Sequence, residues 1–219
     1  YLQTKIITEI NPEINDKIKV HWGCSILLRT MRKSGLGSNA LERSGDMNNL
    51  EIPVGTSDFA EIRQNGYYYV DKTVLISELL KTASNKVTLI TRPRRFGKSL
   101  GMSMLENFFD IRKDSRTLFA GLEISQNKAL CDEWMNQYPV IFLTFKNIDG
   151  LNFQRAYDQL VYEIGSLFEE HSYLTDCEQL SENERQMFRR LQNQQASTVE
   201  ISRSLQLLLQ IMNKYYGKE

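Results

Sequence analysis

The feature that most constrains this chain is a short apolar run that leads through a loop into Gly97-Lys98-Ser99. The run covers Val87–Thr91, and the residues after it have the apolar spacing of an amphipathic helix. A P-loop holds phosphates in this context, which is a strand followed by a tight loop and a helix that begins with Gly-Lys-Ser. The loop departs from the general pattern at Arg92, where a glycine is expected. The run therefore predicts a phosphate-binding loop of unusual sequence.

Each residue type in this loop has a chemical role. Backbone N–H groups wrap the phosphates, and the amino terminus of the following helix adds partial positive charge. Lys98 is expected to reach the β- and γ-phosphates, and the Ser99 hydroxyl is expected to bind Mg²⁺. Arg94 and Arg95 either contact phosphates or are solvated charges that could meet an acidic partner. The candidate nucleotide-binding residues are Arg94, Arg95, Phe96, Gly97, Lys98, Ser99 and Leu100.

A second apolar run and several helical patterns predict the fold class. Val140–Phe145 is nearly all apolar, which is typical of a strand buried on both faces of a parallel sheet. Apolar residues recur at helical spacing in segments on either side of it, namely 74–79, 100–109, 129–136, 153–168, 184–195 and 201–212. The order of strands and helices predicts an α/β fold of the P-loop NTPase type, with a parallel sheet and flanking helices.

Some local signals predict structure rather than chemistry. Asp58, with Glu61 three positions later, is a helix-start signature. Asp71 is expected to cap a helix rather than to act in catalysis. The aromatic run Tyr67–Tyr69 is expected to pack mainly in the core, with contact to a nucleotide base as the alternative. His171 follows a polar helix end and is expected to be exposed.

The amino-terminal part of the sequence differs from the rest. Residues 1–50 have scattered apolar side chains and a linker-like stretch at Ser34–Asn39. They are predicted to form a poorly structured leader or arm. The pattern becomes orderly just after Met47, which is a plausible natural start, so that residues 1–46 would be non-native. Residues 51–219 are predicted to form the N-terminal part of a P-loop domain.

Composition excludes several classes of partner. The 219 residues include 27 basic and 27 acidic side chains, so no overall field attracts nucleic acid. No apolar stretch is long enough to cross a membrane. The three cysteines are odd in number and far apart, which favours a reducing compartment, and hence the cytoplasm, over a disulfide framework.

The acid that completes a P-loop catalytic site is not evident. Such sites use a carboxylate at the end of a second strand to support Mg²⁺. Val140–Phe145 is followed by Lys146, and Asp149 comes later in the loop. We interpret Asp149 as a loop acid and assign no catalytic residue. The sequence ends just after a helix, so the sheet is expected to be incomplete and the later strands to follow Glu219.

Three motifs, taken in order, resemble a known family. They are Gly66-Tyr67-Tyr68-Tyr69-Val70-Asp71-Lys72-Thr73, then Arg-Pro-Arg-Arg-Phe-Gly-Lys-Ser at 92–99, then Tyr138-Pro139-Val140-Ile141. Together with the opening at Ile52–Phe59, they resemble the AAA-ATPase-like family of bacterial predicted ATP-binding proteins, over about residues 50–217. In that family the loop itself carries arginine at the position of Arg92.

The resemblance implies an ATP-binding module that hydrolyses ATP when complete, with ATP and Mg²⁺ as cofactors. It also implies a later acidic strand and, in many members, a C-terminal nuclease-like domain, the only part expected to meet nucleic acid. Residues 1–219 alone are then expected to be marginally stable and inactive, and to act with the rest of the protein and an unidentified protein partner. A nucleotide-gated interaction module without turnover and a small-molecule kinase remain as alternatives.

Overall fold

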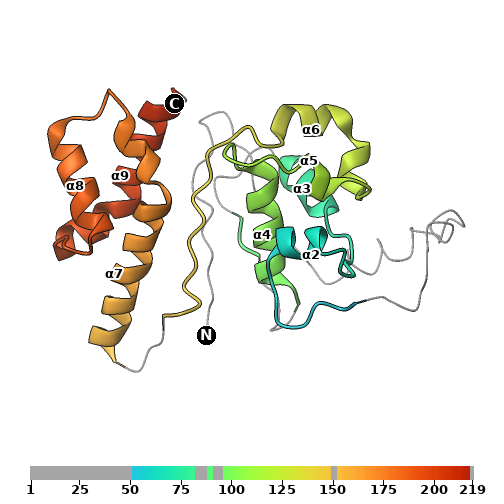
Figure 1. Cartoon of the computed structure of the whole chain (residues 1–219), viewed down its shortest axis with the longest axis horizontal. Helices are drawn as coiled ribbons and strands as arrows, with labels where there is room; N and C mark the ends of the chain where they lie inside the picture. Colours follow the sequence, from blue (N-terminus) through green and yellow to red (C-terminus); the bar gives the residue numbers. More distant parts are fainter. Residues whose placement is uncertain (1–50, 82–87, 91–95, 149–151, 218–219) are drawn as a thin grey trace, which may run out of the picture. The chain divides into compact units, whose positions relative to one another are not determined.

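The computed structural model describes residues 51–81, 88–90, 96–148 and 152–217 (Figure 1). The chain divides into two compact units, and within the described residues the division falls between Tyr138 and Pro139. We call the described residues up to Tyr138 the N-terminal unit and those from Pro139 onward the C-terminal unit. The predicted leader at 1–50, with Met47, lies outside the described residues.

The N-terminal unit is built from short helices around one longer helix (Figure 1). The longer helix is α4 (Lys98–Phe109), whose apolar spacing the sequence predicts. The other elements are α2 (Phe59–Gln64), α3 (Val74–Lys81), α5 (Arg116–Phe119), the 3₁₀ helix η2 (Glu123–Gln126) and α6 (Lys128–Trp134). The Asp58 carboxylate accepts the N–H groups of Ala60 and Glu61, so the predicted cap of α2 is confirmed.

Aromatic rings fill the core of the N-terminal unit. Phe59, Phe108 and Phe119 are fully buried, and they come from α2, α4 and α5. The ring of Phe119 lies 4.8 Å from that of Phe59 and 5.3 Å from that of Phe108, measured between centroids. Buried aromatic pairs of this geometry add stabilisation beyond the area that they bury. The core therefore packs α4 against α2, which precedes it in the chain, and α5, which follows it.

The C-terminal unit begins as an extended segment and continues as helices. Its elements are α7 (Phe153–Glu170), the 3₁₀ helix η3 (Ser172–Asp176), α8 (Glu182–Gln192) and α9 (Thr198–Tyr216), drawn in orange to red in Figure 1. One hydrophobic cluster joins them, and its fully buried members are Phe168, Leu174, Phe188, Leu191, Leu208 and Ile211. The extended segment contributes Ile141 and Leu143 to the same cluster.

Helices α8 and α9 have matching ends. Each begins with a capping box, Ser181 with Glu184 in α8 and Ser197 with Glu200 in α9. Glu184 Oε1 also lies 2.6 Å from Lys214 Nζ near the end of α9, and Glu200 Oε1 lies 2.5 Å from an Arg190 nitrogen near the end of α8. The acid that starts each helix thus pairs with a base near the end of the other.

The predicted location of His171 is wrong. This residue ends α7 and is fully buried, although the sequence around it is polar. Its Nδ1 lies 2.9 Å from the Leu167 carbonyl oxygen, to which it donates, and its ring lies beside Tyr173. The chain turns at this helix end into η3, and the turn directs the imidazole inward.

The predicted parallel sheet is also wrong. The described residues contain helices and no strand, and their one ladder contact is an isolated parallel bridge between Asp110 and Tyr138. Residues 88–90 and Val140–Phe145 form no strand, while the ends of the first run, Val87 and Thr91, lie outside the described residues. An apolar, β-branched run specifies burial, but a strand also needs a neighbouring backbone to bond to. Helices bury part of Val140–Phe145, because Ile141 and Leu143 pack into the hydrophobic cluster of the C-terminal unit.

Of the helices that the structure describes, none has the length and hydropathy needed to cross a bilayer. Cys131 and Cys177 are free thiols, and Cys24 lies outside the described residues.

Candidate functional site

The predicted phosphate-binding loop meets α4 at Gly97. This residue is the N-cap of the helix and has φ 73° and ψ 24°, the left-handed region that favours glycine. The helical ladder begins at once, because Gly101 N donates to the Gly97 carbonyl oxygen at 2.8 Å. Gly97 has no side chain to cap the helix, and the first turn of α4 contains no acid. The amino end of α4 therefore keeps its positive character.

The structure brings together five of the seven candidate residues. Lys98, Ser99 and Leu100 form the half-buried first turn of α4, directly after Gly97. Phe96 is 57% exposed and precedes the turn. Arg94 and Arg95 lie outside the described residues, as do Arg92 and the loop acid Asp149.

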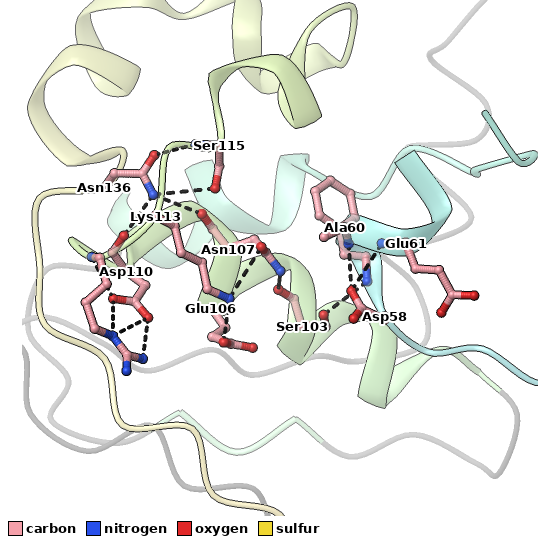
Figure 2. Close-up of polar contacts among 12 residues, drawn as sticks. Asp58, Ala60, Glu61, Ser103, Glu106, Asn107, Asp110, Lys113, Ser115 and Asn136 are labelled. Atoms are coloured by element: carbon pink, nitrogen blue, oxygen red, sulfur yellow. Dashed lines mark hydrogen bonds and ion pairs between the residues drawn. The ribbon is translucent and has the colours of Figure 1, made fainter. Parts of the chain in front are cut away.

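Polar contacts hold α4 beyond its first turn (Figure 2). Ser103 Oγ accepts the N–H of Phe59 at 3.0 Å, which joins the middle of α4 to the start of α2. Asn107 Nδ2 donates to the Ser103 carbonyl oxygen at 2.8 Å. Lys113 Nζ lies 2.6 Å from a Glu106 oxygen and so joins α4 to the turn that follows it. These contacts lie within the N-terminal unit and fix the helix that carries Lys98 and Ser99.

Asn136 fastens the far end of α4. Its side-chain amide donates to the carbonyl oxygens of Asn107 and Asp110, at 3.2 and 2.9 Å, and its Oδ1 accepts the N–H of Ser115 at 3.0 Å (Figure 2). Asn136 has φ 57°, a conformation that asparagine tolerates better than most residues. Asp110, fully buried, is paired with the Arg112 guanidinium through both carboxylate oxygens. The carboxyl end of α4 is thus held by a buried polar cluster.

Asp71 and Thr73 tie the start of α3 to η2. One Asp71 oxygen accepts the backbone N–H and the hydroxyl of Thr73, at 2.8 and 2.7 Å. The other accepts the N–H of Glu123 at 2.7 Å, and Thr73 Oγ1 accepts the N–H of Ile124 at 3.1 Å. The carboxylate therefore serves structure, and it joins two segments far apart in sequence.

Lys72 lies between Asp71 and Thr73 in sequence, and its side chain reaches the start of α4. A Cβ atom placed on Gly97 would lie 3.1 Å from Lys72 Nζ, so the ammonium group occupies the space beside this glycine. No candidate assignment from the sequence included Lys72. Its one signal was its position in the Asp-Lys-Thr part of the first family motif.

The three tyrosines of 67–69 have separate surroundings. Tyr69 packs on Phe59 with ring centroids 5.3 Å apart and donates its hydroxyl to Met104 Sδ. Tyr68 is 48% exposed. Tyr67 lines an open cavity of about 300 Å³, together with residues of the Glu51–Thr56 segment and Glu61. The carboxylates of Glu51 and Glu61 make this cavity a poor site for phosphate.

The described residues hold little other reactive chemistry. They contain no group of three His, Cys, Asp or Glu side chains that could hold a metal ion. Burial, and then the neighbouring Asp132, raise the pKa of the Cys131 thiol, which makes it a weak nucleophile. Within this part of the chain, the start of α4 is the strongest candidate site.

Comparison with known proteins identifies the family. The profile of the AAA-ATPase-like family, described as predicted AAA-ATPase, matches residues 53–217. The chain therefore belongs to this family, as its motifs indicated, and the family is one of nucleotide-binding, ATPase-like proteins.

One curated relative is similar over part of its length. The "Uncharacterized protein in vnfD 5'region" of Azotobacter chroococcum mcd 1 is 34% identical over 100 residues. These residues are 45% of this chain and 18% of that protein, so the chain spans a minor part of this relative. No solved structure matches the chain significantly.

Proposed function

We propose that the start of α4 binds the phosphates of ATP, and that this nucleotide controls the action of the protein on a partner or on a further part of its own chain. The observation that carries the proposal is Gly97-Lys98-Ser99 at a helix start with a left-handed glycine and no first-turn acid. Membership of an ATPase-like family supports ATP as the nucleotide.

The residues at this helix start fit a phosphate group. The first N–H groups of α4 point out of the helix end, and the helix dipole favours an anion there. The space next to Gly97 is bordered by an ammonium group and would be crowded by a Cβ. A site with glycine at the turn and lysines around it suits an anion that approaches the backbone closely.

Each residue has a defined part in this proposal. The Lys98 ammonium binds phosphate oxygens, and Ser99 offers its hydroxyl as one ligand to Mg²⁺. Phe96 and Leu100 flank the turn, and Arg94 and Arg95 supply further positive charge. ATP with Mg²⁺, when bound, provides the phosphoanhydride bond that hydrolysis would break. Mg²⁺ takes water and phosphate oxygens readily, so a single hydroxyl ligand at this position is sufficient to fit it.

Calorimetric titration of the full chain with ATP, in Mg²⁺ and in EDTA, tests the proposal. Lys98→Ala is expected to abolish tight binding, because it removes the charge that contacts the phosphates. Ser99→Ala is expected to remove the difference between Mg²⁺ and EDTA. Lys128→Ala, on the separate helix α6, is the matched control and should bind as the unaltered chain does. Unchanged affinity in Lys98→Ala would exclude the start of α4 as the ATP site.

The same preparations separate the kinds of function. Phosphate release that Lys98→Ala removes would make the chain an ATPase. Binding without release would favour the nucleotide-gated interaction module, in which occupancy alone is the switch. Transfer of phosphate to an added small-molecule acceptor would favour the kinase.

A further inference from the structure

The ammonium group of Lys72 lies at the turn that starts α4. Its Nζ would be 3.1 Å from a Cβ on Gly97, although the two residues are 25 positions apart in sequence. Gly97 is the residue whose left-handed backbone opens the helix. The Lys72 ammonium group therefore lies where a ligand would approach the amino end of α4.

The backbone of Lys72 is held on both sides. Asp71, just before it, uses both carboxylate oxygens to accept hydrogen bonds from Thr73 and Glu123. Thr73, just after it, is fully buried and accepts the N–H of Ile124. Because both neighbours are anchored, the position from which the Lys72 side chain extends is fixed. A placement of this kind costs less conformational entropy when a ligand binds.

The charge around Lys72 favours an anion. Among the described residues, no carboxylate lies within ion-pair distance of Lys72 Nζ, and the oxygens of adjacent Asp71 are directed to N–H groups and a hydroxyl. The amino end of α4 is positive, and its first turn carries Lys98 and no acid. An anion bound at this helix end would be attracted by both the helix dipole and the Lys72 ammonium group.

We propose that Lys72 is a second phosphate-binding residue, which contacts the nucleotide from the segment just before α3 while Lys98 contacts it from α4. This inference rests on the proposed function of the α4 start. Asp71 and Thr73 are its positioning residues, because they hold the backbone of Lys72 without reaching the ligand. The Asp-Lys-Thr motif thereby joins the phosphate site to α3 and η2.

The test compares Lys72→Gln with Lys81→Gln in the full chain. Both lysines are exposed; Lys72 lies two residues before α3, and Lys81 is its last residue and pairs with Glu78 on the surface. Dissociation constants are measured for MgATP and for inorganic tripolyphosphate, and melting temperatures are measured without ligand. Lys72→Gln should weaken both ligands about tenfold, the loss of one charge-assisted contact. Lys72→Arg should recover much of the affinity, and Lys81→Gln should change nothing.

The melting temperature distinguishes a ligand contact from a structural role. Removal of a cation from a positive helix end should leave the ligand-free protein equally stable or more stable, with a smaller stabilisation by MgATP. Unchanged dissociation constants in Lys72→Gln, with binding still abolished by Lys98→Ala, would overturn the role of Lys72 alone. Absence of binding by the unaltered chain, or binding that survives Lys98→Ala, would overturn the proposed function itself and the Lys72 inference with it.

Discussion

The helices α8 and α9 and the helix α4 begin in opposite ways. Ser181 and Ser197 cap their helices, and a glutamate at the third position of each helix completes a capping box. Helix α4 starts instead at Gly97, with no side-chain cap and with Lys98 as its first residue. Capped ends satisfy N–H groups with a side chain at the helix start, whereas Gly97 offers no side-chain acceptor to the first N–H groups of α4. The difference separates helix ends that serve stability from one that can serve binding.

The contrast extends to the surroundings of the helices. The starts of α8 and α9 are each tied to the end of the other helix, through Lys214 and Arg190. Helix α4 is fastened along its middle and far end, through Ser103 and Asn136, while its start is bordered by Lys72. These contacts along α4 hold its amino end in place for the proposed phosphate site.

The largest expected loss of stability is at Gly165, where α7 approaches the end of α8. A Cβ there would lie 2.9 Å from Gln194 Cγ and 3.4 Å from the carbonyl oxygens of Leu191 and Gln192. Gly165→Val is expected to lower the free energy of unfolding by about 2 kcal/mol through overpacking. Gly165→Ala is the control, because its single methyl group meets mainly the flexible Gln194. Denaturant titration measures both, and a stable valine variant would contradict the close packing.

The next effect tests the left-handed start of α4. Gly97→Ala is expected to cost about 1 kcal/mol, because φ near +73° is unfavourable for alanine. The new Cβ should also displace Lys72 Nζ and weaken MgATP binding. The control is Gly101→Ala in the same helix, where a Cβ meets nothing within 4 Å and which should gain about 0.5 kcal/mol from helix propensity. Equal behaviour of the two alanine variants would remove the special role of Gly97.

Loss of a cap should affect stability alone. Ser181→Ala and Ser197→Ala are each expected to lower the free energy of unfolding by about 1 kcal/mol. Neither should change the affinity for MgATP. Hydrogen exchange followed by mass spectrometry would locate the loss in α8 and α9. Ser202→Ala is the control, because the Ser202 hydroxyl donates to the Val199 carbonyl oxygen within its own helix and caps no helix start. A change in nucleotide affinity would break the distinction between the two kinds of helix start.

The smallest expected effect is an acid dependence of the C-terminal unit. The hydrogen bond from Lys214 lowers the pKa of Glu184 to about 2, and the hydrogen bond from Arg190 lowers that of Glu200 to about 2, from an ordinary value of 4.5. In this range the unfolded chain binds more protons than the folded one, so stability falls as pH decreases from about 5 to 2. Both pairs are open to solvent through their bases, because the side chains of Lys214 and Arg190 are 37% and 43% exposed, so salt should weaken the effect. Glu184→Gln should flatten the pH profile of hydrogen exchange in α8 and α9, and an unchanged profile would contradict the Glu184–Lys214 pairing.

Helices with clear apolar spacing were predictable from the sequence. The segments 100–109, 153–168 and 201–212 all fall within helices, α4, α7 and α9 respectively. The short elements α5, η2 and η3 were not predicted, because four or five residues carry too little periodicity to be recognised. The buried position of His171 was missed for a related reason, since the turn after α7 decides where the ring points.

For the candidate site, the sequence predicted only residues that lie next to one another in the chain, around the start of α4. Gly97, Lys98 and Ser99 were predicted from the Gly-Lys-Ser motif and its flanking segments, and three ordered motifs indicated the family that the comparison then confirmed. Lys72 could not be assigned from spacing, because its approach to Gly97 depends on how α3 and α4 are placed. Ser103 and Asn136 were missed too, since each acts through hydrogen bonds to distant backbone groups.

By itself, the sequence determined the helical segments, the Gly-Lys-Ser helix start and the family. Periodicity and local motifs are properties of neighbouring residues, so they can be read without a fold. The tertiary structure decided that Val140–Phe145 is buried against helices and forms no strand, and that Lys72 borders Gly97. Both depend on which distant segment becomes a neighbour, because apolar character favours burial without choosing the surface that provides it.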